Sequence, residues 1–110
     1  MTDTTPAVVP RYLSAADSGN FGALAECFAL SGSVVDEGET YRGHAEIIGW
    51  REALAGKWVY TSNVTGSEAI GTDDYRVHVH VEGNFPGGVA DLAYRFRLHD
   101  GLIDELFIAG

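Results

Sequence analysis

The sequence predicts an α+β fold, with helices in its first half and a strand meander in its second. Apolar residues recur at helical spacing before residue 57. From Trp58 onward, β-branched and aromatic residues dominate, and turn signals separate the runs by short spacers. Short spacers favour antiparallel pairing. The turn signals lie at 71–74, 84–88 and 100–101.

Three helices are expected before residue 57. The first covers 5–18, with Thr5 as its cap and Pro6 in its first turn. Because a proline in a helix interior loses a hydrogen bond, Pro10 indicates that the helix proper begins near Val8. Ser18-Gly19-Asn20 is a stop and restart signal, followed by helices expected over 21–29 and 44–56.

Five strand-like runs accompany these helices. A short strand begins at Val34 and Val35, and Gly38 and Gly43 are expected to bracket an irregular segment after it. Four longer strands are expected in the second half of the chain. Their ranges are 58–70, 75–83, 89–98 and 102–108.

Alternation along the strands predicts two unlike sheet faces, because successive side chains point to opposite sides. One face is apolar and suited to cover the helices, whereas the other is polar and either wet or paired with another subunit. The apolar set is Tyr75, Val77, Val79, Val81, Leu92, Tyr94, Phe96 and Leu98, and the polar set is Arg76, His78, His80, Glu82, Asp91, Arg95 and Arg97.

Length and composition predict one domain over residues 1–110 with a substantial apolar core, since 45% of the residues are hydrophobic. The net charge of −9 argues against nucleic-acid and anionic-membrane partners, which need a basic face. Cys27 stands alone, so no intrachain disulfide is expected. The N-terminal residues lack a signal-peptide pattern, and we expect a cytoplasmic protein.

The two histidines of one strand face raise the question of a metal site. His78 and His80 have a spacing that could chelate a metal, but the sequence offers no evident third and fourth ligands. Both lie on the polar face, where a surface or dimer-interface role is favoured. We therefore expect no metal and no cofactor.

Three stretches of the chain, taken in order, resemble the NTF2-like fold, and within it the SnoaL-like proteins and ketosteroid isomerases. The resemblance implies three N-terminal helices packed on a curved, mostly antiparallel sheet that forms a cone. It also implies a homodimer formed through the outer sheet face. The stretches are AVVPRYLSAADSGNFGALAECFA, SVVDEGETYRGHAEIIGW and VEGNFPGGVADLAYRFRLHDGLIDELFI.

The resemblance also implies a catalytic pair. Tyr12 falls at the position of the isomerases' oxyanion-binding tyrosine, and Asp36 at that of their proton-shuttling carboxylate. The third catalytic group of that family, a protonated acid, falls on Leu92, which cannot donate a hydrogen bond. The other interpretation of Asp36 is an ordinary turn residue, as the neighbouring Glu37 and Glu39 are interpreted.

A carboxylate at the rim of an apolar cone is partly desolvated, which raises its pKa toward the range of a useful general base. Tyr12 could then donate a hydrogen bond to an oxygen that gains negative charge. The remaining candidates would bind a flat or cyclic hydrophobic substrate. They are Trp50, Trp58, Tyr60, Leu92, Tyr94 and Phe96.

The sequence leaves three functions open. The first is an isomerase or cyclase that performs acid-base chemistry on a small hydrophobic carbonyl compound. The second is a non-catalytic ligand-binding or dimerisation module, which the leucine at position 92 favours. The third is a protein-interaction domain whose aromatic side chains fill the cone. The enzyme requires that Asp36 and Tyr12 open into one cavity, with the carboxylate and the hydroxyl within about 5–7 Å of each other.

Overall fold

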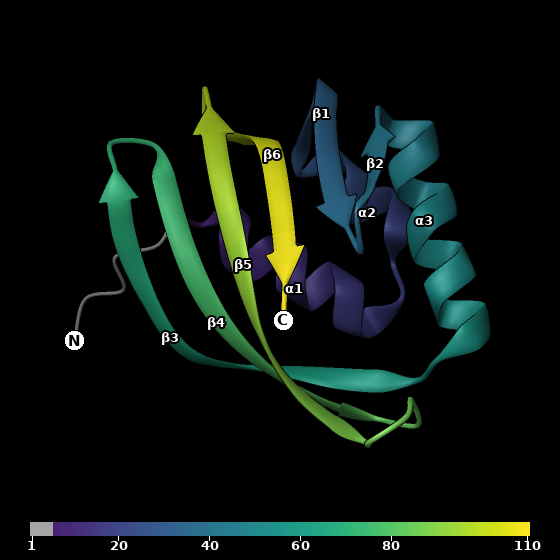
Figure 1. The fold of residues 1–110 in the computed structure, drawn as a ribbon. Coiled ribbons are helices and arrows are strands. Elements are labelled where there is room, and N and C mark those ends of the chain that lie inside the picture. The colour runs from purple at the N-terminus through teal and green to yellow at the C-terminus, as the bar shows by residue number, and fades with distance from the viewer. Residues whose placement is uncertain (1–5) are drawn as a thin grey trace.

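The computed structural model describes residues 6–110, which form three helices and six strands. The helices lie in the first half of the chain and the four long strands in the second, as the sequence predicts (Figure 1). The helices are α1 (Val8–Ser18), α2 (Phe21–Glu26) and α3 (His44–Lys57), and the strands are β1 (Phe28–Asp36), β2 (Glu39–Arg42), β3 (Tyr60–Gly71), β4 (Asp74–Gly83), β5 (Val89–His99) and β6 (Leu102–Ala109).

The six strands form one curved mixed sheet in the order β2-β1-β6-β5-β4-β3. Every neighbouring pair is antiparallel except β1 and β6, which run parallel, so the predicted, mostly antiparallel sheet is confirmed. Figure 1 shows the long strands bending around the first two helices, with α3 beside β2. Among the described residues, no helix is both long and apolar enough to cross a membrane.

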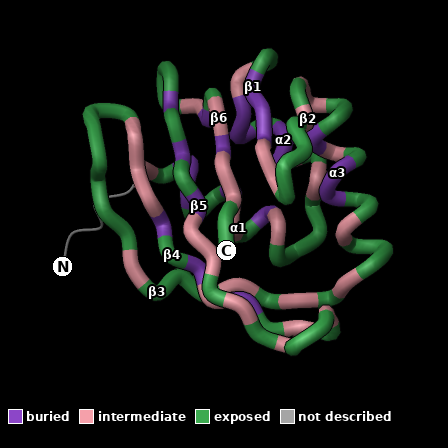
Figure 2. The backbone as a smooth tube through the Cα atoms, viewed as in Figure 1, coloured by how far each residue is buried: buried purple, intermediate pink, exposed green. Residues whose placement is uncertain are grey.

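The core lies between the concave sheet face and the helices (Figure 2). Both predicted face assignments are confirmed. Val77, Val79 and Phe96 are almost completely buried, whereas the arginines on the opposite face of β5 are exposed. The polar outer face is covered by cross-strand ion pairs, including the bidentate pair between Arg95 and Asp74.

The first helix begins at Val8, as the position of Pro10 predicts. The predicted Thr5 cap lies outside the described residues. Gly19 ends α1 in the left-handed conformation, and Asn20 then caps α2 by accepting a hydrogen bond from the backbone N–H of Ala23. The stop and restart signal therefore has the predicted effect.

The predicted end of the second helix is wrong, because α2 ends at Glu26 and Phe28 begins β1. Phe28 fits the helical spacing of α2, yet its side chain is fully buried within the sheet layer. The long-range pairing with β6 outweighs that local pattern, and the backbone N–H of Ile103 donates to the carbonyl of Cys27 at 2.8 Å. A Cβ at Gly32 would lie 2.8 Å from the carbonyl oxygen of Ile103, so only glycine permits this approach.

The segment expected to be irregular between Gly38 and Gly43 contains strand β2 instead. Glu37 and Gly38 both have positive φ angles, 52° and 80°, as in the two-residue turns that suit the twist of a β-hairpin. The turn pairs Asp36 with Glu39. This hairpin holds Asp36 at the end of β1.

The histidines on β4 join ion-pair networks on the outer sheet face. The two ring nitrogens of His80 lie 2.8 and 2.9 Å from carboxylate oxygens of Asp91 and Glu82. These two carboxylates raise the pKa of His80. His78 lies 3.5 Å from Glu68. Within residues 6–110, no group of side chains is arranged to hold a metal ion.

Candidate active site

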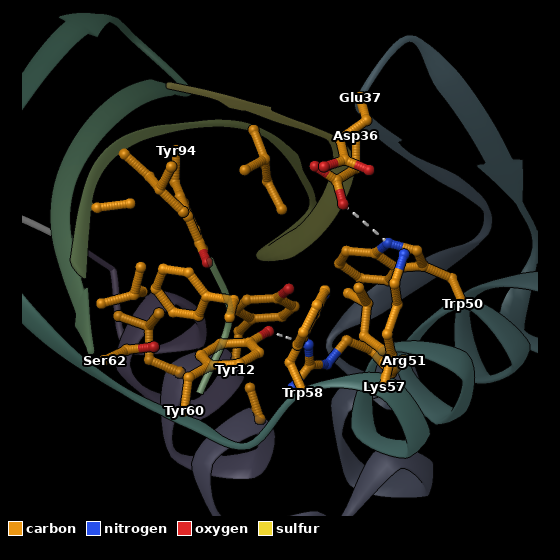
Figure 3. Close-up of a pocket in the computed structure, with 18 of the residues that line it drawn as sticks. Tyr12, Asp36, Glu37, Trp50, Arg51, Lys57, Trp58, Tyr60, Ser62 and Tyr94 are labelled. Carbon is orange, nitrogen blue, oxygen red and sulfur yellow. Dashed lines mark hydrogen bonds between the residues drawn. The ribbon is translucent and has the colours of Figure 1, made fainter. Parts of the chain in front are cut away.

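A cavity of about 410 Å³ opens between the concave face of the sheet and helices α1 and α3. Tyr12 from α1, Asp36 from β1 and Trp50 from α3 all line it. Figure 3 shows their side chains arranged around the same space. The two predicted catalytic side chains therefore line one cavity.

Asp36 is half-buried at the mouth of the hairpin turn. The indole N–H of Trp50 donates to its Oδ2 at 3.1 Å (Figure 3). Burial raises the pKa of Asp36, and the Trp50 hydrogen bond opposes part of that effect. Tyr41 stacks on Trp50 with a centroid distance of 5.9 Å, which fixes the indole beside the carboxylate. Asp36 is thus a carboxylate fixed by a hydrogen bond, and its pKa lies above the ordinary value for aspartate.

Tyr12 is 2% exposed and has its ring in edge contact with three aromatic rings. Those rings belong to Phe28, Tyr94 and Phe96, at centroid distances of 5.9, 6.5 and 5.7 Å. Burial raises the pKa of Tyr12 well above its usual value, so the hydroxyl stays protonated at neutral pH. A neutral, buried hydroxyl on a cavity wall is suited to donate a hydrogen bond to a ligand oxygen.

Five of the six predicted substrate-binding side chains line the cavity, namely Trp50, Trp58, Tyr60, Leu92 and Tyr94. Phe96 is not among the lining residues. Its side chain is fully buried and packs behind Tyr12 and Tyr94. Phe96 does point to the predicted, apolar side of β5. It lies two residues beyond Tyr94 along the strand, however, where the core is closed.

Among residues 6–110, the wall around Leu92 is apolar and carries no acid in place of the missing one. Its neighbours on the cavity surface are Val81, Ala90 and Ile108. Tyr94 lies two residues along the same face of β5 and also lines the cavity. Burial raises the pKa of its hydroxyl, as it does for Tyr12.

Arg51 is one of the cavity residues that the sequence interpretation missed, and it is the charged one that is buried. It is 5% exposed, and its Nη1 donates to the hydroxyl oxygen of Tyr60 (Figure 3). Because an arginine in a helix is ordinarily solvated, Arg51 is not expected as a cavity residue. The available signal was its spacing, because Ile47, Arg51 and Leu54 follow the i, i+4, i+7 pattern of one helix face.

The open cavity contradicts the third function, a protein-interaction domain whose aromatic side chains fill the cone. The aromatic side chains line the space without filling it, so a collapsed cone is wrong for this chain.

Solved structures similar to this chain point to one superfamily. A Sinorhizobium meliloti protein described as a candidate polyketide cyclase is 32% identical, with 96% of this chain and 95% of that chain covered and a TM-score of 0.90. A Catenulispora acidiphila protein with a ketosteroid isomerase-like fold, solved with trimethylamine, is 24% identical over 97% and 87% of the two chains, with a TM-score of 0.87. No family model and no curated protein matches the sequence.

A more distant structure is the Δ5-3-ketosteroid isomerase from Mycobacterium sp., at 17% identity over 94% and 90% of the chains and a TM-score of 0.78, a likeness of fold. The curved mixed sheet, the three helices and the lined cavity define a protein of this fold class. The chain belongs to the NTF2-like superfamily of SnoaL-like and ketosteroid isomerase-like proteins.

Proposed function

We propose that this protein is a cofactor-independent isomerase or cyclase that acts on a small hydrophobic, cyclic carbonyl compound in the cavity. One observation carries the proposal. Asp36, with a raised pKa and a fixed hydrogen-bond partner, opens into the same cavity as the protonated hydroxyl of Tyr12.

In this mechanism, Asp36 removes a proton from the carbon next to the carbonyl group. Its raised pKa makes the carboxylate a stronger base than an exposed aspartate. Tyr12 donates a hydrogen bond to the carbonyl oxygen as that oxygen becomes an enolate, and one such donor typically contributes about 3–4 kcal/mol to the transition state. Asp36 then returns the proton to a different atom. In a cyclisation, the enolate instead attacks a second carbonyl carbon, and the resulting alkoxide takes the proton back from Asp36.

The apolar wall at Leu92 removes one donor that the ketosteroid isomerases use. We propose that Tyr94 supplies a second hydrogen bond in its place, since it lines the cavity from the same strand face. The cyclase description of the Sinorhizobium meliloti relative supports the reaction class, and the trimethylamine complex of the Catenulispora acidiphila protein supports small-ligand binding.

Solvent exchange tests the reaction directly. With 2-tetralone as probe in D₂O, the wild-type protein should exchange the protons next to the carbonyl faster than buffer does, as measured by ¹H NMR. Asp36→Asn should lose the contribution of a general base, about 10²–10⁴-fold, while 2-tetralone still binds. Glu39→Gln changes the exposed carboxylate paired with Asp36 across the hairpin, and it should exchange like the wild type.

Equal exchange in Asp36→Asn and the wild type would remove Asp36 as the base. Binding of 2-tetralone without exchange in the wild type would favour the second candidate, a non-catalytic ligand-binding module. The observation behind that candidate is the apolar wall at Leu92.

We further propose that the protein forms a homodimer through the outer sheet face, as the family resemblance implies. That face presents positive and negative side chains already paired within the chain, such as Arg97 with Glu105 and Arg76 with Glu68, and these neutralised pairs could pack against the same face of a second copy. Sedimentation velocity at micromolar concentration should give the mass of two chains, and Arg95→Glu should shift the protein toward one chain. A wild-type monomer would contradict the dimer.

A further inference from the structure

We propose that the cavity takes a ligand with an anionic oxygen on an apolar ring, and that Arg51 and Tyr60 form the subsite for that oxygen. The inference specifies the ligand class of the proposed active site. It rests on the proposed function only in treating the cavity as the place where the ligand binds.

The guanidinium of Arg51 is a buried positive charge without a direct ion pair among the described residues, although it is near enough to Asp36 and Asp17 to oppose the rise of their pKa values. Arg51 is 5% exposed, and within residues 6–110 no carboxylate forms an ion pair with it. Its Nε is enclosed and has no hydrogen-bond partner among those residues. Buried charges in proteins are normally paired, because an unpaired one is costly. A ligand anion would supply the missing partner.

Three aromatic rings and one hydroxyl surround the guanidinium of Arg51. Its carbon lies 5.2, 5.6 and 5.4 Å from the ring centroids of Phe21, Trp50 and Tyr60. These ring faces stabilise the cation but take none of its hydrogen bonds. The Tyr60 hydroxyl accepts a bond from Nη1, which leaves the hydroxyl proton free to donate. Arg51 and Tyr60 can therefore donate to one ligand oxygen group.

The geometry of Arg51 favours one class of ligand. A guanidinium presents its N–H groups in a planar fork that matches the two oxygens of a carboxylate. The chain as a whole has a net charge of −9, so its long-range field repels anions. A measured preference for an anionic ligand would therefore have to arise locally, at a cation of the cavity wall, either Arg51 or Lys57.

Arg51 also links this subsite to the base. Burial raises the pKa of Asp36, and the nearby Trp50 hydrogen bond and Arg51 charge oppose that effect. A ligand anion at Arg51 would cancel the opposing charge, and Asp36 would become a stronger base with the ligand in place.

A matched ligand pair tests the subsite without reference to activity. Isothermal titration calorimetry at pH 7 should show 2-naphthoate binding at least tenfold more tightly than 2-naphthamide, which has the same shape without the charge. Arg51→Met should remove this preference while keeping the affinity for 2-naphthamide. Lys57→Met is the control, because Lys57 is a second cation that lines the cavity but is exposed, over the ring of Trp58, and the preference should persist.

Three results would overturn the subsite: equal binding of the two ligands by the wild type, no binding of either, or a preference that survives Arg51→Met. Equal losses in Lys57→Met and Arg51→Met would show a general charge effect and also overturn it. If Arg51→Met does not fold, the affinities of the wild-type protein for 2-naphthoate and 2-naphthamide still test the subsite. Naphthoate preference without 2-tetralone exchange would remove the proposed reaction and leave the subsite standing.

Discussion

At the scale of single residues, Asp36 shows how one carboxylate can serve both a turn and a cavity. It ends β1 just before a tight turn, as an ordinary turn residue would. Its side chain nevertheless faces the cavity, where the Trp50 indole holds it. The two interpretations of the sequence are therefore compatible, and the catalytic role remains a proposal for experiment.

The raised pKa of Asp36 has a consequence for stability. Because the folded state favours the protonated form, the contribution of Asp36 to stability is largest below its ordinary pKa, about 4, and is lost as the pH rises through the raised value. Asp36→Asn should therefore raise the free energy of unfolding at pH 7, with a gain that shrinks toward pH 4. Urea denaturation at the two pH values measures this difference.

Glu39→Gln is the control for that measurement, since Glu39 is exposed and should change stability by less than about 0.5 kcal/mol at either pH. A loss of stability in Asp36→Asn at pH 7 would mean that the charged carboxylate is favoured by the fold. That result would contradict the strained, basic Asp36 on which the mechanism depends.

The sequence predicts seven of the nineteen residues that line the cavity, but not their burial. Family position and strand parity suffice for Tyr12, Asp36 and Tyr94. Arg51 needs knowledge of what packs around α3, because helical spacing alone does not say whether an arginine is buried or solvated. Phe96 differs from Tyr94 only in its depth along the strand, which alternation does not report.

At the scale of elements, the hairpin of β1 and β2 is what places Asp36. Glycine at position 38 is needed because its φ angle is 80°, a conformation that costs other residues about 1–2 kcal/mol. Gly38→Ala should lower the free energy of unfolding by about that amount, although a Cβ there would meet no other atom within 4 Å. Chemical denaturation measures it.

Gly49→Ala provides a matched control with the opposite sign. Gly49 lies inside α3, where a Cβ also meets nothing within 4 Å, so alanine should stabilise the protein by about 0.5–1 kcal/mol. A neutral Gly38→Ala would mean that the turn relaxes to another conformation. The position of Asp36 would then not depend on this hairpin.

Helix starts and long strands are predicted well because caps, prolines and alternation act locally. The end of α2 and the existence of β2 are not, because both depend on pairing between distant segments. Phe28 illustrates this point, since its spacing fits a helix and its partner strand β6 lies at the other end of the chain.

At the scale of the whole molecule, the sheet separates two kinds of surface. Its outer face carries ion pairs that satisfy one another, and its concave face surrounds a cavity lined by aromatic, aliphatic and polar side chains. Strand alternation predicts this division from the sequence. The open volume of the cavity is not predicted, because it depends on how tightly the sheet curves and how far the helices stand from it.

The most direct measurement is a structure of the protein with 2-tetralone bound, because the proposed mechanism requires Tyr12 and Asp36 to contact the same ligand. The predicted complex has the carbonyl oxygen about 3 Å from the Tyr12 hydroxyl and the adjacent carbon about 3–3.5 Å from the Asp36 carboxylate. A ligand whose carbonyl points away from Tyr12, with Asp36 turned toward bulk solvent, would contradict the proposed active site.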